Sequence, residues 1–434
     1  MVKERGENQT RCEVYDVAVV GGGAAGCMAA IRAGGSGRRT ALIERNSSVG
    51  KKIKMSGKGR CNITNIADID AFVEAFGKEG KFLRSAFLAF FNWDLIDFFA
   101  SKGLELVPER QGRVFPIDYK ALSVVRVLQE CLRKSNVEIM NNTRVLSLEK
   151  KDTFELKLEN GRILKAEKII LTTGGASFKM TGSTGDGYRF AENFGHTIEP
   201  LVPGLVPLKT KEKWVKEVRG LVLKNVRITF LCDGKKLKSR IGELLFTHFG
   251  ISGPLILDLS GSIAVLLKKS KEIAAFIDLK PALSAERIEE KLLEAFATNG
   301  DSQLTRVIKN FLPQSLIPVI IDLSGAKAKE EASQVKKEIR QNIGRLLKEL
   351  PLTITGTLGL EEAMVTGGGV STKEINPKTM ESKLIPGLYF AGEIIAGFAQ
   401  SGGYNLQQAF STGYLAGDKA GAVGTGVSSA EGQV

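Results

Sequence analysis

The sequence predicts an α/β protein in which a domain built on a parallel sheet is split by an inserted β-rich segment and a helical segment. Three observations support this fold class. A strand, a glycine-rich turn, a helix and a second strand follow one another over residues 15–44. Apolar strands that end in glycines recur near residues 171 and 390, so both parts of the chain are expected to supply strands to one sheet. Between them, residues 197–280 alternate with period two and residues 284–350 follow helical spacing.

The first of these units carries the spacing Gly21-x-Gly23-x-x-Gly26 between its first strand and its helix. Gly21 suits a tight turn, Gly23 lets the backbone approach a pyrophosphate, and Gly26 lets helix and strand pack closely. The phosphates would bind the free N–H groups at the helix N-terminus. Glu44 ends the second strand, where a carboxylate can accept both hydroxyls of an adenosine ribose. The unit therefore predicts a Rossmann-like dinucleotide site for an unphosphorylated ribose.

Length and composition limit the class of protein. The chain has 434 residues with 43% hydrophobic content, which predicts two or three domains. Neither an apolar run of about 18 residues nor an apolar N-terminal stretch occurs, so we expect a soluble, cytoplasmic protein without a membrane partner. The five cysteines include no Cys-x-x-Cys pair and there are two histidines, which argues against a disulfide framework and a metal site.

The formal charge is +13, from 61 basic and 48 acidic residues, with a local excess over Lys51–Arg60. A basic surface can attract nucleic acid or anionic substrates. It can equally reflect a general lysine bias together with neutralisation of a cofactor diphosphate. We favour the second interpretation and keep the first open.

Along the chain, the order of the expected elements follows the hydrophobic period. Helices are expected over 82–91, 93–100, 122–134 and 405–416, and strands over 143–148, 153–158, 162–164, 168–171, 221–231, 264–267, 273–279, 352–355 and 387–391. The first three of these strands read as a meander, and those after residue 197 as a small barrel or curled sheet.

A long cofactor is expected because glycine-bearing strand ends lie on both sides of a large insertion, whereas a nicotinamide domain is usually contiguous. FAD fits, with its adenosine half on residues 21–44 and its flavin half on later segments. Glu393 offers a carboxylate at a strand end, and a helix that opens after Gly403 offers a positive end for the negative charge of a reduced flavin. The run Gly367–Gly369 lacks the third glycine of a second dinucleotide motif. We therefore expect NAD(P)H, if used, to dock only transiently.

At this point the chain resembles the aminoacetone oxidase-type, BaiN/YhiN-like, FAD-binding flavoproteins of the two-dinucleotide-binding-domain class. The resemblance covers most of the chain and rests on Gly50–Asn65, Thr173–Gly175, Thr181–Tyr188, Leu245–Pro254, Met364–Gly369 and Gly402–Leu406. It implies an FAD-binding domain over 1–197 and 366–434, a β-barrel over 198–280 and 351–365, and a helical subdomain over 281–350. It also implies FAD contacts from Lys51, Ser56, Arg60, Cys61, Asn62, Asn405 and Leu406, and from Val145 at the adenine.

Two departures from the family pattern keep the substrate from being carried over. The segment Ile394–Phe398 is neutral where the family has an acid after the Gly-Glu pair, and Lys179 stands where the family has proline.

The candidate site residues follow from both arguments. For FAD they are Gly21, Gly23, Ala24, Ala25, Gly26, Glu44, Arg45, Lys51, Lys52, Ser56, Gly57, Arg60, Cys61, Asn62, Val145, Thr173, Gly174, Gly175, Gly392, Glu393, Gly403, Asn405 and Leu406. The candidate proton-transfer residues are His248 and Tyr404, each with a structural role as its alternative. For Cys61 we expect a backbone contact rather than redox chemistry, because it has no partner cysteine.

The function predicted from the sequence is that of an FAD-dependent oxidoreductase. It would transfer two electrons at flavin N5 to or from a small organic substrate, with NAD(P)H or oxygen as redox partner. Reduction of an activated double bond and oxidation of an amine both fit. The alternatives are a flavoprotein that modifies tRNA, suggested by lysines near Lys51 and over Lys209–Lys224, and a flavin-binding protein without catalysis. The oligomeric state is not encoded in any pattern we find.

Overall fold

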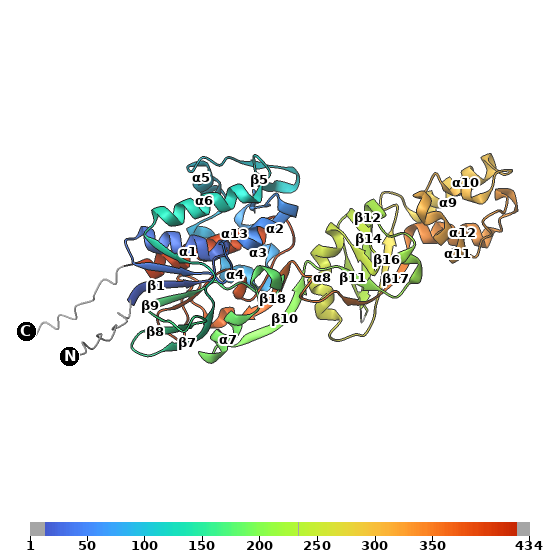
Figure 1. Cartoon of the computed structure of the whole chain (residues 1–434). Coiled ribbons are helices and arrows are strands. Elements are labelled where there is room, and N and C mark those ends of the chain that lie inside the picture. Colours follow the sequence, from blue (N-terminus) through green and yellow to red (C-terminus); the bar gives the residue numbers. More distant parts are fainter. Residues whose placement is uncertain (1–13, 233, 423–434) are drawn as a thin grey trace, which may run out of the picture. The chain divides into compact units, whose positions relative to one another are not determined.

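The computed structural model describes residues 14–232 and 234–422 of the chain (Figure 1). The polar N-terminal segment considered above lies outside these residues. The chain divides into two compact units, and each is described by itself. Of the described residues, the sheet unit comprises 14–201 and 365–422, and the barrel unit comprises 202–232 and 234–364.

The sheet unit is built on a seven-stranded sheet in the order β6-β2-β1-β9-β8-β7, with β19 also paired to β9. The strands are β1 (Val14–Val20), β2 (Thr40–Ile43), β6 (Val137–Met140), β7 (Val145–Lys150), β8 (Phe154–Leu158), β9 (Ile163–Leu171) and β19 (Leu388–Phe390). β6, β2, β1, β9 and β19 are mutually parallel, whereas β7 and β8 continue the sheet antiparallel. The expected α/β fold class is confirmed.

β9 joins two strands that the sequence analysis kept apart. Its first half, Ile163–Ala166, pairs with β8, and its second half, Ile169–Leu171, pairs with β19 on the same side. One continuous strand therefore ends the meander and also supplies the parallel strand that runs into Thr172. In this way the late strand β19 enters a sheet begun by the first residues of the chain.

Two helices from opposite ends of the chain pack closely on each other. They are α1 (Ala24–Gly35) and α13 (Tyr404–Gly421), which lie together in Figure 1. A side chain at Gly413 or Gly417 would collide with the backbone of Ala25 or Ala29. Glycines four residues apart thus let the two helix backbones approach each other.

Shorter elements complete the sheet unit. The helices are α2 (Lys51–Met55), α3 (Ile69–Ala75), α4 (Gly80–Ala89), α5 (Asn92–Ala100), α6 (Ala121–Lys134) and α7 (Asp186–Asn193). β3 (Thr64–Asn65), β5 (Arg113–Pro116) and β4 (Leu106–Pro108) form a small antiparallel sheet, and β10 (Ile198–Gly204) pairs with β18 (Val365–Val370).

The barrel unit contains a sheet whose pairings close on themselves. Its strands are β11 (Leu208–Thr210), β12 (Val222–Cys232), β13 (Lys235–Lys238), β14 (Gly242–Phe246), β15 (Gly250–Ser252), β16 (Ile273–Asp278) and β17 (Leu350–Thr357). The order is β13-β12-β14-β15-β11-β17-β16, and β16 pairs again with β12, so six antiparallel strands form a ring and β13 lies outside it. This is the small barrel expected from the period-two pattern.

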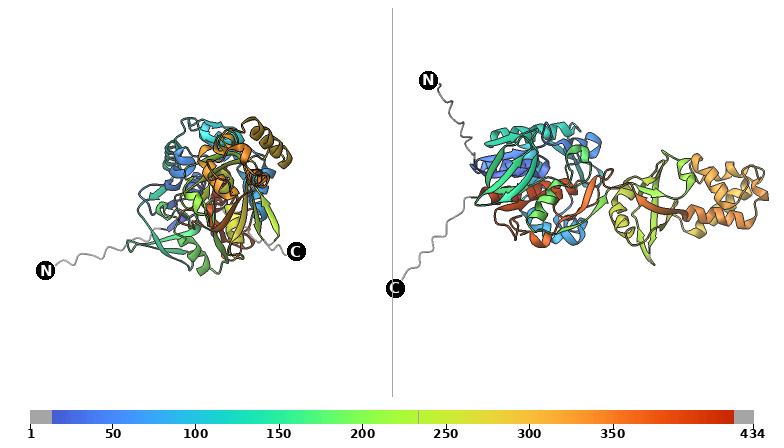
Figure 2. Two further views of the ribbon diagram at one scale, coloured as in Figure 1. Left: turned by 90° about the vertical axis from the view of Figure 1, so that its right-hand side faces the viewer. Right: turned by 60° about the horizontal axis from the view of Figure 1, so that its bottom comes forward.

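Helices cover one end of this barrel, as the right-hand view of Figure 2 shows. They are α9 (Ala285–Thr298), α10 (Leu304–Ile308), α11 (Ile317–Ser324) and α12 (Lys337–Lys348), and their apolar faces share one core with the strands. A further helix, α8 (Pro254–Leu266), contradicts the strand expected at 264–267. That short apolar run is the last turn of a helix that begins at Pro254, and periodicity alone does not separate the two in a short window.

No helix in the described ranges combines the length and the apolar character needed to span a membrane.

Candidate cofactor-binding site

The glycine turn between β1 and α1 has the geometry that each of its glycines predicts. Gly21 has φ of +106°, and a Cβ there would lie 2.6 Å from the carbonyl oxygen of Thr172. At Gly26 a Cβ would lie 2.6 Å from Oγ1 of Thr172, whereas at Gly23 it would meet no atom within 4 Å. The turn is therefore tight where the strands pack and open in front of the helix.

The N-terminus of α1 offers free donors to that open space. No side chain caps the helix and no acidic residue lies in its first turn. The N–H groups of Ala24 and Ala25 are therefore available to a ligand. Free N–H groups and the positive end of a helix dipole suit a pyrophosphate. The residues present therefore fit the diphosphate of a dinucleotide.

Glu44 is buried at the end of β2 and is held beside the turn. Its Oε2 accepts the N–H of Gly22 at 2.7 Å, and its Oε1 accepts the backbone and side-chain N–H groups of Asn46 at 2.7 and 2.6 Å. These bonds fix a carboxylate at the position where we expect the adenosine ribose.

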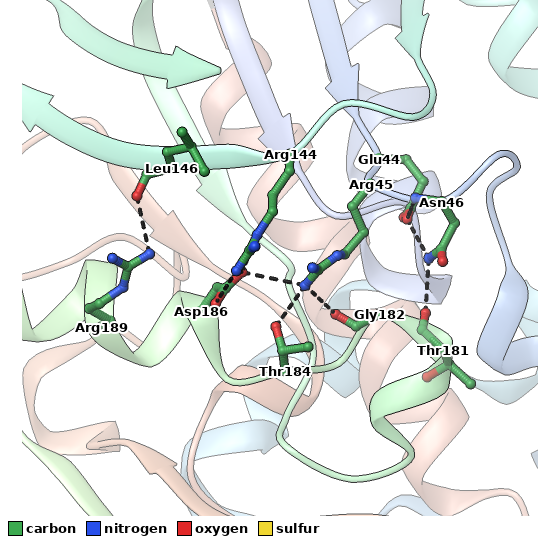
Figure 3. A network of polar contacts seen from close by, with 10 residues as sticks. All are labelled: Glu44, Arg45, Asn46, Arg144, Leu146, Thr181, Gly182, Thr184, Asp186 and Arg189. Carbon is green, nitrogen blue, oxygen red and sulfur yellow. Dashed lines mark hydrogen bonds and ion pairs between the residues drawn. The ribbon is translucent and has the colours of Figure 1, made fainter. Parts of the chain in front are cut away.

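Next to Glu44, two arginines converge on one aspartate (Figure 3). Arg144 donates to Asp186 from Nε at 3.1 Å and from Nη2 at 3.0 Å, and Arg45 reaches the same carboxylate at 3.4 Å. Arg45 also donates to Oγ1 of Thr184 at 2.7 Å. We call these four residues the Asp186 clasp. It joins the end of β2, the start of β7 at Val145, and the loop before α7.

The sequence analysis missed three members of the clasp. Arg45 was a candidate, but Arg144, Thr184 and Asp186 were not. A signal existed for Asp186 and Thr184, because both lie in the block Thr181–Tyr188 that carries part of the family resemblance. Arg144 had only its position before Val145 to mark it.

A second polar cluster joins three distant segments. Lys52 in α2 donates from Nζ to Glu393 at 2.7 Å and to Ser177 at 2.9 Å. The other oxygen of Glu393 accepts from the hydroxyl of Ser177 at 3.0 Å and from the N–H of Thr366 at 2.8 Å. The structure thus brings Lys52 and Glu393 together, and it adds Ser177, which the sequence analysis did not single out as a site residue.

The segment after β9 packs against that cluster. A Cβ at Gly175 would lie 3.0 Å from Oε1 of Glu393, and Gly174 has φ of +73°. Oγ1 of Thr173 is buried and has no hydrogen-bond partner among the residues that the structure describes. Gly392, just before Glu393, also has positive φ, and a Cβ there would lie 2.8 Å from the side chain of Ala25. The loops after β9 and β19 are therefore held close together beside the N-terminus of α1.

The block that follows α2 folds into a tight loop. Lys51 donates to the side-chain oxygen of Asn46 at 3.1 Å, and the hydroxyl of Ser56 donates to the carbonyl of Ile53 at 2.7 Å. Gly57 has positive φ, and Cys61 closes the loop by donating its N–H to Ser56 at 3.0 Å. Burial raises the pKa of the Cys61 thiol to about 12, so its side chain is unsuited to thiolate chemistry.

Arg60 and Asn62 point to different neighbours. The Arg60 guanidinium lies 4.6 Å from the ring centre of Phe115 and 3.7 Å from Glu109, so it contacts protein groups of β5 and its approach. The amide of Asn62, oriented to satisfy its neighbours, accepts the N–H of Gly403 at 3.0 Å and donates to Thr64 at 3.0 Å. Asn62 therefore fixes the N-terminus of α13.

That N-terminus is shaped by glycine and asparagine. Gly403 has φ of +101°, and a Cβ there would collide with the backbone of Thr64. The Asn405 side chain accepts the N–H of Ala399 and donates to its carbonyl, both at 2.9 Å, and Leu406 is half-buried. No acidic residue lies in the first turn of α13, so its positive end is not neutralised from within the helix.

The two candidate proton-transfer residues lie in different units. The Tyr404 ring, at the start of α13, packs edge-on against Phe72 with ring centres 4.6 Å apart. His248 is exposed in the turn between β14 and β15 of the barrel unit, and its ring lies 4.7 Å from that of Phe249. The other histidine, His196, is buried and hydrogen-bonded to Ser382 at 2.8 Å, which is a structural environment.

All the candidate cofactor residues lie in the sheet unit. Most lie at the carboxyl ends of parallel strands or at the N-termini of α1 and α13, and the others lie in α2, in the loop after it and at the start of β7. Such a site extends over more segments than a single β-α-β unit provides. The fold and the site define an FAD-dependent oxidoreductase. The profile of the family described as HI0933-like protein Rossmann domain matches residues 15–419, and the chain belongs to this family.

Two relatives of known activity match nearly the whole chain. The 3-dehydro-bile acid delta(4,6)-reductase of Clostridium scindens is 35% identical over 407 residues, which cover 92% of this chain and 98% of the relative. The ribosomal RNA dihydrouridine synthase of Escherichia coli is 32% identical over 406 residues, which cover 93% of this chain and 97% of the relative.

Solved structures support the fold. A 3-ketosteroid delta1-dehydrogenase from Sterolibacterium denitrificans superposes with a TM-score of 0.51 over 94% of this chain and 99% of that chain, at 14% identity. The open conformation of a flavocytochrome c3 fumarate reductase gives 0.50 over 94% and 78%, at 17% identity. At such identities the likeness concerns the fold alone.

Proposed function

We propose that this enzyme reduces a carbon–carbon double bond conjugated with a carbonyl group inside a ring. The observation that carries the proposal is a feature common to two relatives with unlike substrates. One is named a delta(4,6)-reductase of a 3-dehydro-bile acid and the other a dihydrouridine synthase. A 4,6-diene beside a 3-oxo group and the 5,6-double bond of uracil are both activated by a carbonyl. Oxidation of an amine, the other reaction compatible with the sequence, has no such support from these names.

The chain's own residues would hold FAD in three places. The N-terminus of α1 would bind the pyrophosphate, and Glu44 the ribose hydroxyls. The cluster of Lys52 and Glu393 would face the ribityl chain, where a carboxylate accepts a hydroxyl and an ammonium donates. When bound, FAD supplies a carrier of two electrons that are exchanged at N5. Cys61, the one thiol among the candidate FAD residues, is buried and its pKa is raised to about 12, so it is unsuited to thiolate chemistry.

The N-terminus of α13 would stabilise the negative charge that develops at the N1–C2=O edge of a reduced flavin. Its first turn contains no acid, and the N–H of Gly403 donates to the side-chain oxygen of Asn62, which holds the start of the helix in place. A helix end contributes about 0.3 to 1 kcal/mol to an exposed anion, and up to about 2 kcal/mol when the anion is partly buried.

Reduction of the double bond also requires one proton, delivered to the carbon next to the carbonyl. We propose His248 and Tyr404 as the two candidates for its delivery. A proton donor typically contributes about 10² to 10⁴-fold to the rate. Tyr404→Phe keeps the ring that packs on Phe72 and removes only the hydroxyl, and His248→Gln changes an exposed side chain. A loss of that size in one variant, with FAD still bound, would identify the donor.

The test of the proposed function is a cycle of reduction and reoxidation followed by the visible spectrum of the flavin. The purified protein is mixed anaerobically with NADH or NADPH, and then with a cyclic enone such as 2-cyclohexen-1-one. Bleaching by one nucleotide and return of the colour on adding the enone would support the proposal. Bleaching by an amine, with no reoxidation by any enone, would contradict it.

A second candidate is that the ring reduced is a uracil base of RNA. The ribosomal RNA dihydrouridine synthases of Escherichia coli and Haemophilus influenzae, each 32% identical to this chain, favour it together with the charge of +13. The four described cysteines are buried and none of them is in a disulfide, which fits the reducing cytoplasm that we propose as the location. The sequence analysis named tRNA in this alternative, whereas these two relatives are named for ribosomal RNA.

A further inference from the structure

The positive charge of the chain is concentrated in the barrel. Residues 202–280 contain 15 lysines and arginines but only 7 aspartates and glutamates. The helical segment 281–350, which belongs to the same unit, contains 11 basic and 10 acidic residues and is nearly neutral. A general lysine bias would charge both segments alike. The excess therefore calls for a local explanation.

Five of these lysines gather where β13 meets the end of α8. Lys235 and Lys236 lie on β13, and Lys268, Lys269 and Lys271 follow α8 directly; all five are exposed. Two contacts bring the segments together. Sγ of Cys232 lies 3.5 Å from Oγ of Ser270, and Leu231 of β12 pairs with Ala274 of β16. We call the five lysines the β13–α8 basic surface.

No carboxylate of the described residues pairs with these five lysines, so none of the five forms an ion pair within residues 14–232 and 234–422. Other basic residues of the barrel do, since Lys211 lies 2.9 Å from Glu272 and Arg240 lies 2.7 Å from Asp258. Unpaired lysines close together repel one another, so an anionic partner that binds several of them gains affinity from every contact.

Between the two lysine-bearing segments lies an apolar hollow of about 440 Å³. Its lining includes Phe230, Leu237, Val265 and Leu266, and Lys235 and Lys236 stand at its rim. Phe230 belongs to the barrel core and is only 1% exposed, so the accessible floor is aliphatic, from Leu237, Val265 and Leu266. An aliphatic floor beside cationic side chains suits a flat ring attached to a phosphate chain, because the ring packs on apolar groups while lysines bind phosphates. β13 is also an edge strand, paired in the described chain only with β12, so its outer backbone groups are available to a ligand.

We propose that the β13–α8 basic surface binds the phosphate backbone of RNA, with an unpaired base in the hollow. This rests on the proposed function, because it identifies the reduced ring as a uracil that is part of an RNA chain. The surface would hold the RNA by contacts that do not depend on its sequence, and the reduction itself would take place at the flavin.

The experiment measures binding of a labelled RNA hairpin, with uridines in its loop, over a series of salt concentrations. The test variant changes Lys235, Lys236, Lys268 and Lys269 to alanine. For single-stranded nucleic acid each phosphate contact contributes about 0.7 to the slope of log K against log salt, so the slope should fall by about 3 and the affinity at 0.1 M salt by about 30-fold or more. Replacement of the same four lysines by arginine keeps the charge and should restore most of the binding.

The matched control changes Lys327, Lys329, Lys336 and Lys337 to alanine, which removes the same charge from exposed positions of the helical segment. Its RNA affinity should stay within about threefold of the wild type. Equal losses in both variants, or no RNA binding by the wild type, would overturn the proposal, and so would binding to anionic lipid vesicles in place of RNA.

The same preparations separate this proposal from the proposed function. Each variant should keep the flavin spectrum and its bleaching by NAD(P)H, because the surface lies outside the cofactor residues. If enone reduction fails while the test variant alone loses RNA, the surface stands and the proposed reaction does not. If enone reduction succeeds and RNA binding is absent, the reaction stands and the surface is refuted.

Discussion

Replacement of Asp186 by asparagine should weaken FAD binding without unfolding the protein. The Asp186 clasp ties the segment after Glu44 to the start of β7 and to the loop before α7 (Figure 3). These three segments surround the expected adenosine half of the cofactor. Without the carboxylate, Arg45 and Arg144 would repel each other, and the loop would have to be ordered when FAD binds. That ordering cost would lower the affinity.

The size of the effect follows from the geometry. Arg144 makes three bonds to Asp186, at 3.0, 3.1 and 3.3 Å, and Arg45 adds a longer one at 3.4 Å, with the aspartate side chain 22% exposed. A hydrogen bond to a charged group contributes about 1.5 to 3 kcal/mol when buried, whereas exposed ion pairs contribute about 0 to 1 kcal/mol. For this partly exposed clasp we take about 1.5 kcal/mol, which corresponds to an approximately tenfold higher dissociation constant for FAD.

The assay is titration of the apoprotein with FAD, followed by quenching of flavin fluorescence, with the melting temperature of the apoprotein as a check on folding. The control is Asp70→Asn, because Asp70 pairs with Arg84 at 2.6 Å on an exposed surface. It should leave the affinity unchanged. An Asp186→Asn protein that binds FAD as tightly as the wild type would refute the role assigned to the clasp.

Three further predictions concern the stability and reactivity of the sheet unit. Gly417→Ala should lower the free energy of unfolding by about 1 to 3 kcal/mol in a denaturant titration, because the added Cβ would lie 2.8 Å from Cα of Ala29. The control is Gly35→Ala, whose Cβ would meet no atom within 4 Å, so this change should not destabilise the protein. Burial lowers the pKa of His196, so near neutral pH the unfolded chain binds more protons than the folded chain. The free energy of unfolding should therefore be highest above about pH 6.5 and should fall as the pH is lowered below that value. In urea titrations at successive pH values, His196→Gln should show a smaller fall. Burial raises the pKa of Cys61 to about 12, so its thiol should not react in the folded protein at pH 8. The native wild type and Cys61→Ala should therefore be labelled by a thiol reagent at the same rate, and should differ only after unfolding. Faster labelling of the native wild type would contradict the burial argument.

The parts of the fold that depend on local pattern were predictable. The β-α-β unit over residues 15–44 is confirmed because turn, helix and strands are each encoded by adjacent residues. The strand expected at 264–267 is wrong, since four apolar residues fit the end of α8 equally well. The pairing of β12 with β16, which closes the barrel, could not be predicted from the sequence. It joins segments about 45 residues apart, and no local pattern specifies it.

The site divides in the same way. The steric roles of Gly21, Gly23 and Gly26 could be derived from spacing, and the structure gives each of them the surroundings that its role requires. The contact of Lys52 with Glu393 joins residues 341 positions apart, and only the folded sheet brings them together. The FAD contacts assigned to these side chains stay predictions until the bound cofactor is observed.

The division of the chain offers a reason why relatives so similar over their whole length bear names with such different substrates. Every candidate FAD residue lies in the sheet unit, where α13 and β19 from the end of the chain complete a sheet and a helix pair begun at its start. In that part, Gly413 and Gly417 allow no larger side chain against α1. The barrel unit contributes none of these FAD residues and carries most of the unbalanced charge. On the proposed RNA-binding role of the β13–α8 basic surface, changes to the barrel surface would alter which substrate is held without replacing any candidate FAD residue.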